Sequence, residues 1–121
     1  MVLVGKDLVA ASATPLVLGI LAEGDNYGYA ILQRIAELSD GRLDWSEGML
    51  YPLLHRLERQ GQVEAFWSAE SGRRRKYYRL TPTGRAAITD HRAQWDAVVT
   101  TLTRLAESAG PHPRLAEGGL A

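Results

Sequence analysis

A short basic turn places the strongest constraint on how this 121-residue chain can fold. The turn, residues 71–76, reads Ser-Gly-Arg-Arg-Arg-Lys. It covers most of a loop at 70–74 and the first residues of the second of two segments with strand-like alternation, 62–69 and 75–80. Two such segments joined by a short glycine-containing loop predict a β-hairpin. Thr81-Pro82, a helix-start signal, follows directly, so the hairpin leads into a helix without a linker.

Three helical signals precede the hairpin. An apolar segment at 14–24 opens with Thr-Pro, which is typical of an N-cap and first helical residue, and a weaker signal for a short helix or arm covers 5–12. Helical spacing of apolar residues predicts a second helix at 27–39 and a third at 45–61. Ser46 is expected to cap the third helix with its hydroxyl.

This order of elements predicts a fold class. Three helices followed by a hairpin make a winged helix-turn-helix, in which the third helix enters the major groove of DNA and the hairpin tip, the wing, lies beside it. We therefore expect an α+β, mostly α, protein. Residues 1–81 would form the DNA-binding domain, 82–107 a dimerisation helix, and 108–121, which is rich in Gly and Pro, a disordered tail.

Composition excludes several classes of protein. The absence of cysteine excludes a disulfide framework and thiolate chemistry. The longest apolar run, 15–22, is too short to span a bilayer, and no charged-then-apolar signal sequence opens the chain. We therefore expect a cytoplasmic protein.

The formal net charge of zero conceals an uneven distribution. Residues 1–45 carry three basic and six acidic side chains, a net charge of −3. Residues 46–79 carry seven basic and four acidic side chains, a net charge of +3, and residues 80–121 carry four of each. Because salt screens charges beyond about 8 Å at physiological ionic strength, a local basic patch can bind phosphate whatever the total charge.

One face of the third helix carries the candidates for DNA contact. At about 100° per residue its leucines fall on one side, and small and polar side chains fall on the other. The candidates are Ser46, Glu47, Gly48, Met49, Tyr51, Pro52, His55 and Arg59. Bases are read near the start of such a helix, although a solvated amphipathic helix would show the same pattern.

The wing favours DNA contact by the third helix over a merely solvated helix. Its cations are Arg73, Arg74, Arg75 and Lys76, and guanidinium groups suit phosphates and narrow minor grooves. An isolated turn of this kind is usually only solvated, but here it follows a candidate recognition helix at the distance a wing requires. The alternative is a winged-helix protein-interaction module without DNA contact.

The last helix carries an apolar stripe with heptad spacing. The stripe is Ile88, His91, Trp95, Val98, Leu102 and Leu105. No other element of so short a chain can easily cover it, so the stripe predicts a homodimer in which a second copy of this helix, together with the first helix, buries the seam. Packing on its own domain is the alternative, although the charges at 92, 96 and 104 leave only a narrow seam.

Trp95 allows two interpretations. It is either plain interface core, or one of two symmetry-related indoles with a gap between them that accepts a flat aromatic molecule by stacking. His91 lies one turn away and can line the same gap, or simply pack in the seam.

No pattern for catalysis accompanies these features. The histidines at 55, 91 and 112 lack metal-ligand spacing, and the chain has no Gly-rich phosphate loop, nucleophile elbow or paired-carboxylate motif. The sequence thus predicts neither an enzyme nor a metal or cofactor site. Tyr27 and Tyr29, on either side of Gly28, are expected to pack on the wing or core.

Three segments resemble the PadR family of transcriptional regulators. They are Gly-Asp-Asn-Tyr-Gly-Tyr-Ala-Ile at 24–31, Met-Leu-Tyr-Pro-Leu-Leu-His-Arg-Leu-Glu at 49–58, and Gly-Arg-Arg-Arg-Lys-Tyr-Tyr-Arg-Leu-Thr-Pro-Thr-Gly at 72–84. The resemblance extends over about residues 8–105. The single C-terminal helix is similar to that of the short subfamily, which includes multidrug-binding repressors.

The resemblance implies a dimeric repressor that a small ligand releases from DNA. It also implies that Tyr51 and the wing arginines touch the DNA backbone, and that Trp95 occupies the place of a pocket tryptophan. Met49 departs from the family, which often has Thr or Ser there. The twofold symmetry of the predicted dimer suggests a pseudo-palindromic operator. The position of Trp95, together with the resemblance, suggests a planar aromatic ligand.

Overall fold

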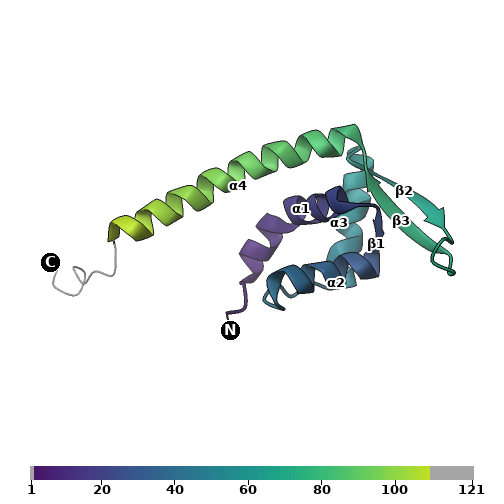
Figure 1. Cartoon of the computed structure of the whole chain (residues 1–121), viewed down its shortest axis with the longest axis horizontal. Coiled ribbons are helices and arrows are strands. Elements are labelled where there is room, and N and C mark those ends of the chain that lie inside the picture. The colour runs from purple at the N-terminus through teal and green to yellow at the C-terminus, as the bar shows by residue number, and fades with distance from the viewer. Residues whose placement is uncertain (1, 110–121) are drawn as a thin grey trace. The chain divides into compact units, whose positions relative to one another are not determined.

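The computed structural model describes residues 2–109, and its helices and strands follow the expected order (Figure 1). The elements are α1 (Lys6–Glu23), β1 (Asn26–Tyr27), α2 (Gly28–Ser39), α3 (Glu47–Arg59), β2 (Val63–Ser68), β3 (Arg75–Leu80) and α4 (Pro82–Ala109). The expected fold class is confirmed: a mostly helical α+β winged helix-turn-helix is followed by a C-terminal helix.

α1 is longer than the sequence indicates. The start expected at Thr14 is wrong, because one continuous helix begins at Lys6 and carries Pro15 in its interior. Proline removes a hydrogen bond within a helix. Buried side chains on both sides of the proline, from Val9 to Leu21, hold the two segments together as one helix.

The sheet has one more strand than expected. The hairpin is confirmed, with β2 and β3 paired antiparallel from Val63 opposite Leu80 to Ser68 opposite Arg75. The two-residue strand β1 pairs with the other edge of β3, which gives the order β1-β3-β2. So short a strand has no periodicity for the sequence to reveal.

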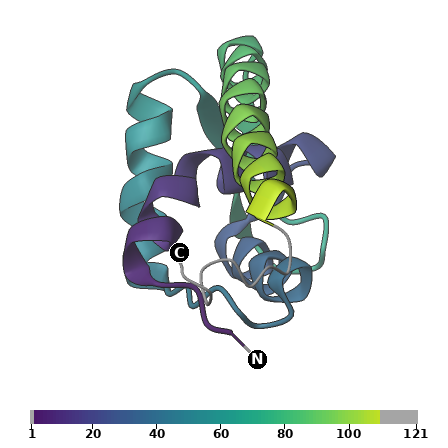
Figure 2. The same ribbon diagram turned by 90° about the vertical axis from the view of Figure 1, so that its left-hand side faces the viewer.

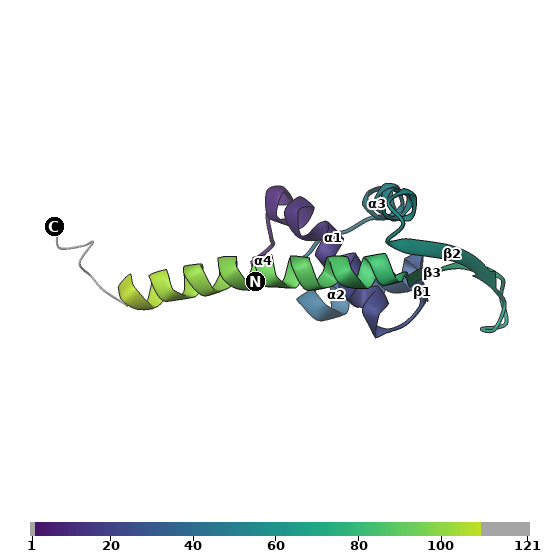
Figure 3. The same cartoon turned by 90° about the horizontal axis from the view of Figure 1, so that it is seen from above.

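The core lies between α1, α2, α3 and the base of the sheet. Its buried side chains are Val17, Leu18, Ile20, Leu21, Ile31, Ile35, Leu50, Leu53, Leu54, Leu57, Val63, Tyr78, Leu80 and Ile88. Figure 2 shows α1, α2 and α3 lying against one another, and Figure 3 shows the hairpin tip reaching beyond them. Burial, with smaller effects of Glu58 and Tyr51, raises the pKa of the Tyr78 hydroxyl.

α4 begins in this core and continues outside it. Ile88 is 6% exposed and packs within its own domain, so its assignment to the dimer stripe is corrected. The boundary between two compact units falls between Asp90 and His91. The helix continues to Ala109, so the tail does not begin at 108, and the disorder expected for 110–121 lies outside the described residues.

Thr81 ties the start of α4 to the end of α3. Its hydroxyl oxygen accepts a hydrogen bond from the Gly84 N–H (3.0 Å) and donates to the Gly61 carbonyl (2.5 Å). The backbones approach closely at this junction: a Cβ added to Gly84 would collide with the carbonyl oxygen of Gln62 and lie 2.9 Å from Leu80 Cδ2.

We therefore expect Gly84→Ala to lower the free energy of unfolding by about 1–3 kcal/mol, the usual cost of overpacking. The measurement is urea denaturation. The matched control is Gly48→Ala, since an added Cβ in α3 would meet only Ser46 Oγ within 4 Å, at 3.7 Å. That change should raise stability by about 0.5–1 kcal/mol because alanine favours helix. Equal stability of the two variants would contradict the tight junction.

Candidate nucleic-acid interface

α3 has one buried and one solvent-facing side, as its sequence predicts. The leucines are buried, while the solvent-facing side carries Ser46, Glu47, Gly48, Met49, Pro52, His55 and Arg59, with Tyr51 half-buried at its edge. Ser46 occupies the N-cap position, but its hydroxyl makes no capping hydrogen bond. The capping expected of that hydroxyl is therefore wrong. The Ser46 carbonyl begins the helix by accepting from the N–H groups of Met49 and Leu50.

Tyr51 lies across the first residue of α2. A Cβ added to Gly28 would collide with Tyr51 Oη and lie 2.6 Å from its Cζ, so a side chain there would displace the tyrosine. The rings of Tyr51 and His55 are 6.5 Å apart. Gly28 thereby lets α2 and α3 approach and places the Tyr51 hydroxyl beside the start of α2.

The two tyrosines that flank Gly28 differ in their surroundings. Tyr27 packs edge-on against Tyr77, with ring centroids 5.4 Å apart, so its expected packing on the wing is confirmed. Tyr29 is 59% exposed, and the packing expected for it is wrong. Tyr29 is thus a candidate contact residue that sequence reasoning missed, because its neighbours are brought together only by the fold.

Aromatic rings hold several cations of the hairpin. The guanidinium carbon of Arg74 lies 4.4 Å from the Trp67 ring centroid, and that of Arg75 lies 4.5 Å from the Tyr27 centroid. Arg75 also donates to the Ser71 hydroxyl at 2.8 Å. These contacts fix the planes of the two guanidinium groups and leave N–H donors at their edges.

Carboxylates divide the arginines of the domain into two groups. Arg79 has its Nε 3.8 Å from Asp25 and 3.7 Å from Glu64, so nearby charge partly compensates it. Among residues 2–109, no carboxylate forms an ion pair with the arginines at 73–75. Several uncompensated positive charges therefore lie close together at the tip of the wing.

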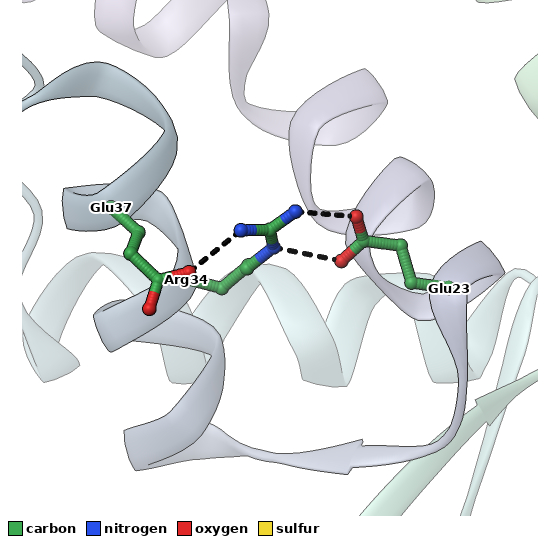
Figure 4. Close-up of polar contacts among 3 residues, drawn as sticks. All are labelled: Glu23, Arg34 and Glu37. Carbon is green, nitrogen blue, oxygen red and sulfur yellow. Dashed lines mark hydrogen bonds and ion pairs between the residues drawn. The ribbon is translucent and has the colours of Figure 1, made fainter.

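Arg34 is an arginine whose donors are already occupied (Figure 4). Its Nε and Nη2 donate to the two carboxylate oxygens of Glu23 at 2.9 and 2.8 Å, and its Nη1 donates to Glu37 at 2.6 Å. The hydrogen bond from Arg34 lowers the pKa of Glu23, and both carboxylates raise the pKa of Arg34. This exposed group joins α1 to α2 and has a structural role.

The wing, α2 and α3 border an open hollow of about 480 Å³. It is lined by Tyr27, Gly28, Tyr29, Tyr51, Trp67, Arg73, Arg74, Arg75 and Lys76. The first turn of α2 begins in this hollow, and a helix N-terminus favours anions. Four cations, three tyrosines and a helix start form a surface whose chemistry suits phosphate oxygens.

The predicted residues thus gather into two sets. The wing cations and Tyr51 meet in this hollow, whereas Met49, Pro52 and Arg59 line a separate groove of about 450 Å³ between α3 and α1. The fold therefore brings the expected phosphate-contacting residues together, whereas several of the other candidates on α3 line a different groove.

The second unit carries the remaining candidates. Beyond His91, the apolar side chains of α4 face solvent, with Leu102 61% exposed and Val98, Val99 and Leu105 also exposed. Trp95 and His91 are partly covered. Val99, which is not at a heptad position, is exposed beside this apolar stripe.

Within residues 2–109 no cluster of three or more His, Cys, Asp or Glu side chains could hold a metal ion. No helix in the same range is long and apolar enough to cross a membrane.

A known protein family and several known proteins resemble this chain over more than half of its length. Residues 17–90 match the family model described as "Transcriptional regulator PadR-like family". The "Transcriptional regulator Rv3488" of Mycobacterium tuberculosis is 41% identical over 76 residues, which are 63% of this chain and 68% of that protein.

Two solved structures extend the likeness beyond the matched segment. A PadR family transcription regulator from Clostridium difficile is 30% identical, with a TM-score of 0.68, over 78% of this chain and 97% of its own. A PadR-like transcriptional regulator from Bacillus cereus is 27% identical, with a TM-score of 0.76, over 83% and 96% of the two chains.

Proposed function

The chain belongs to the PadR-like family of transcriptional regulators, and from this premise we propose that it is a repressor that binds duplex DNA as a homodimer. The observation that carries the proposal is the hollow of four cations and three tyrosines beside the solvent-facing side of α3. The basic turn and the third helix each suggest DNA contact from the sequence alone, and both contribute residues to this hollow.

The proposed contacts divide into phosphate and base contacts. Tyr51, Tyr29 and the cations at 73–76 bind the backbone, which fixes the register of the protein on the duplex. The base-reading set is Ser46, Glu47, Gly48, Met49 and Pro52, because the early part of a recognition helix reaches the base edges of the major groove. His55 and Arg59 lie further along the same side of α3 and complete the proposed contact surface. Met49 would read an edge by apolar contact rather than by a hydroxyl.

The proposed homodimer rests on the exposed stripe of α4. Trp95, Val98, Leu102 and Leu105 would pack against the same residues of a second copy, with Val99 at the margin. Two copies related by a twofold axis read a pseudo-palindrome with half-sites about one helical turn, or about 10–10.5 base pairs, apart. The protein would act in the cytoplasm, where its operator is accessible.

Fluorescence anisotropy with labelled duplex DNA tests DNA binding. Affinity should fall steeply as salt rises from about 50 to 200 mM, since log K falls by about 0.9 per unit of log salt for each phosphate contact. A winged-helix protein-interaction module without DNA contact would show no such slope. Failure to bind any duplex at low salt would favour that alternative.

We further propose that a planar aromatic compound binds between the two copies of Trp95, with His91 beside it. Such a ligand must prefer one spacing of the recognition helices, since equal affinity for both spacings would shift nothing. The partial exposure of Trp95 within an apolar, unpartnered stripe supports this, as does the family resemblance.

Trp95→Ala is expected to abolish quenching of indole fluorescence by flat aromatic dyes and phenolic compounds. DNA binding without ligand should stay within a few fold of the parent. Trp45 and Trp67 contribute background, so the titration is made in a Trp67→Phe protein, with and without the Trp95 change. If the compounds bind the Trp95→Ala protein as tightly as its parent, Trp95 is only interface core.

A further inference from the structure

Trp67 lies on the same face of the hairpin as core residues but outside the core itself. Strand alternation places Val63, Ala65 and Trp67 on one face, and Val63 is buried. Trp67 is nevertheless 57% exposed, because the hairpin tip extends past the helices (Figure 3). Burial in the core therefore does not account for an indole at this position.

The neighbour that covers Trp67 is an arginine of the turn. Trp67 pairs with Lys76 across the ladder, and Arg74 lies two residues further toward the tip, where diagonal neighbours of a large ring can reach it. The Arg74 guanidinium carbon is 4.4 Å from the ring centroid, well within the range of a cation–π contact, for which tryptophan is the best ring.

No other group in residues 2–109 holds the Arg74 side chain. Among the described residues, side-chain hydrogen bonds or ion pairs engage five other arginines: Arg34, Arg42, Arg56, Arg75 and Arg79. The contact given for the Arg74 side chain is that with the indole. A free arginine must lose much rotamer freedom when it binds phosphate, and stacking reduces this cost by ordering the side chain beforehand. The stacked face leaves the donors at the guanidinium edge available to an anion.

We propose that Trp67 is a positioning residue of the DNA interface, which acts by holding Arg74 with its donor edge in the hollow that also contains Tyr51. This inference rests on the proposed function and assigns a role to a residue outside both the recognition helix and the basic turn. Tyr27 gives Arg75 a comparable ring, and both residues line the same hollow. The wing is thus a pair of stacked arginines rather than a loose charged loop.

A double-mutant cycle on duplex affinity tests this role, using the full chain as Trp67→Ala, Arg74→Ala, both changes together, and Trp67→Phe. Trp67→Ala should weaken binding about two- to fivefold per wing, the size of an exposed cation–π contact, and Trp67→Phe should restore most of it. In the Arg74→Ala protein the tryptophan change should have no further effect, because the residue through which it acts is absent.

Two readouts separate positioning from other roles. Trp67→Ala should leave the salt slope nearly unchanged, since it removes no charge, whereas Arg74→Ala should lower it by about 0.9 per phosphate contact. In DNA-free protein, NMR should show the side-chain protons of Arg74 shifted upfield by the indole ring current, and Trp67→Ala should remove that shift. The melting temperature should not change, since Trp67 lies outside the core.

The outcomes distinguish this inference from the proposed function. Additive effects of the two changes would mean that Trp67 touches DNA directly or acts elsewhere, and would overturn the positioning role. Parent-like affinity of Trp67→Ala would also overturn it while leaving DNA binding intact. If the parent bound no duplex at low salt, the proposed function and this inference would fail together.

Discussion

Replacing Arg74 and Arg75 by alanine together is expected to weaken binding to specific and random duplexes alike, by on the order of tenfold to a hundredfold near physiological salt. These arginines lie at the tip of the wing with no carboxylate ion pair among residues 2–109, so their charge is available to phosphate. Phosphate contacts supply affinity without sequence information. The change should therefore lower both affinities and leave their ratio nearly constant.

The salt dependence gives the sharper measurement. The slope of log K against log salt should flatten by about 0.9 for every phosphate that the variant no longer neutralises, and the proposed dimer presents both arginines on each of its wings. The matched control replaces Arg85 and Arg92, two exposed arginines of α4, so that it removes the same charge away from the wing. An unchanged slope in the wing variant, or an equal change in the control, would mean that net charge rather than the wing governs binding.

The sequence predicts those helices and strands in which apolar residues recur at a regular spacing. The leucine stripe of α3 and the alternation of β2 and β3 each extend over several residues, so their buried sides can be identified in advance. Local signals are less dependable. Thr14-Pro15 resembles a helix start, yet Pro15 lies inside α1, because apolar packing on both sides outweighs one missing hydrogen bond.

The parts that could not be predicted depend on residues far apart in the chain. Tyr29 faces the same hollow as the wing only because α2 begins where Tyr51 crosses Gly28. The stacking of Arg74 on Trp67 requires the hairpin register, which the basic turn alone does not specify. Ile88 has the spacing of an interface residue, but the fold places it in the core of its own domain.

Leu102→Asp is expected to convert the protein to a folded monomer. Leu102 is 61% exposed in the single chain, so an aspartate there leaves the core of residues 1–90 untouched. In the proposed dimer both copies would bury an unpaired carboxylate, at an effective cost of several kcal/mol each. Since every 1.4 kcal/mol is about tenfold in affinity, the dissociation constant of the dimer should rise by more than about a thousandfold.

Sedimentation velocity measures the change, and circular dichroism checks that the helices persist. Thr103→Asp is the matched control, because it adds the same charge to the next, exposed residue of α4, away from the heptad positions. It should remain dimeric. A Leu102→Asp protein that sediments as a dimer would show that the α4 stripe is not the interface.

The consequence for DNA binding distinguishes a dimeric reader from a monomeric one. Two half-sites bound through one dimer act at a high effective concentration, and this advantage disappears when the copies separate. Operator affinity of the Leu102→Asp protein should fall far more than its affinity for a single half-site. Equal decreases on both duplexes would indicate that each copy reads DNA independently, and the exposed stripe of α4 would then need another partner.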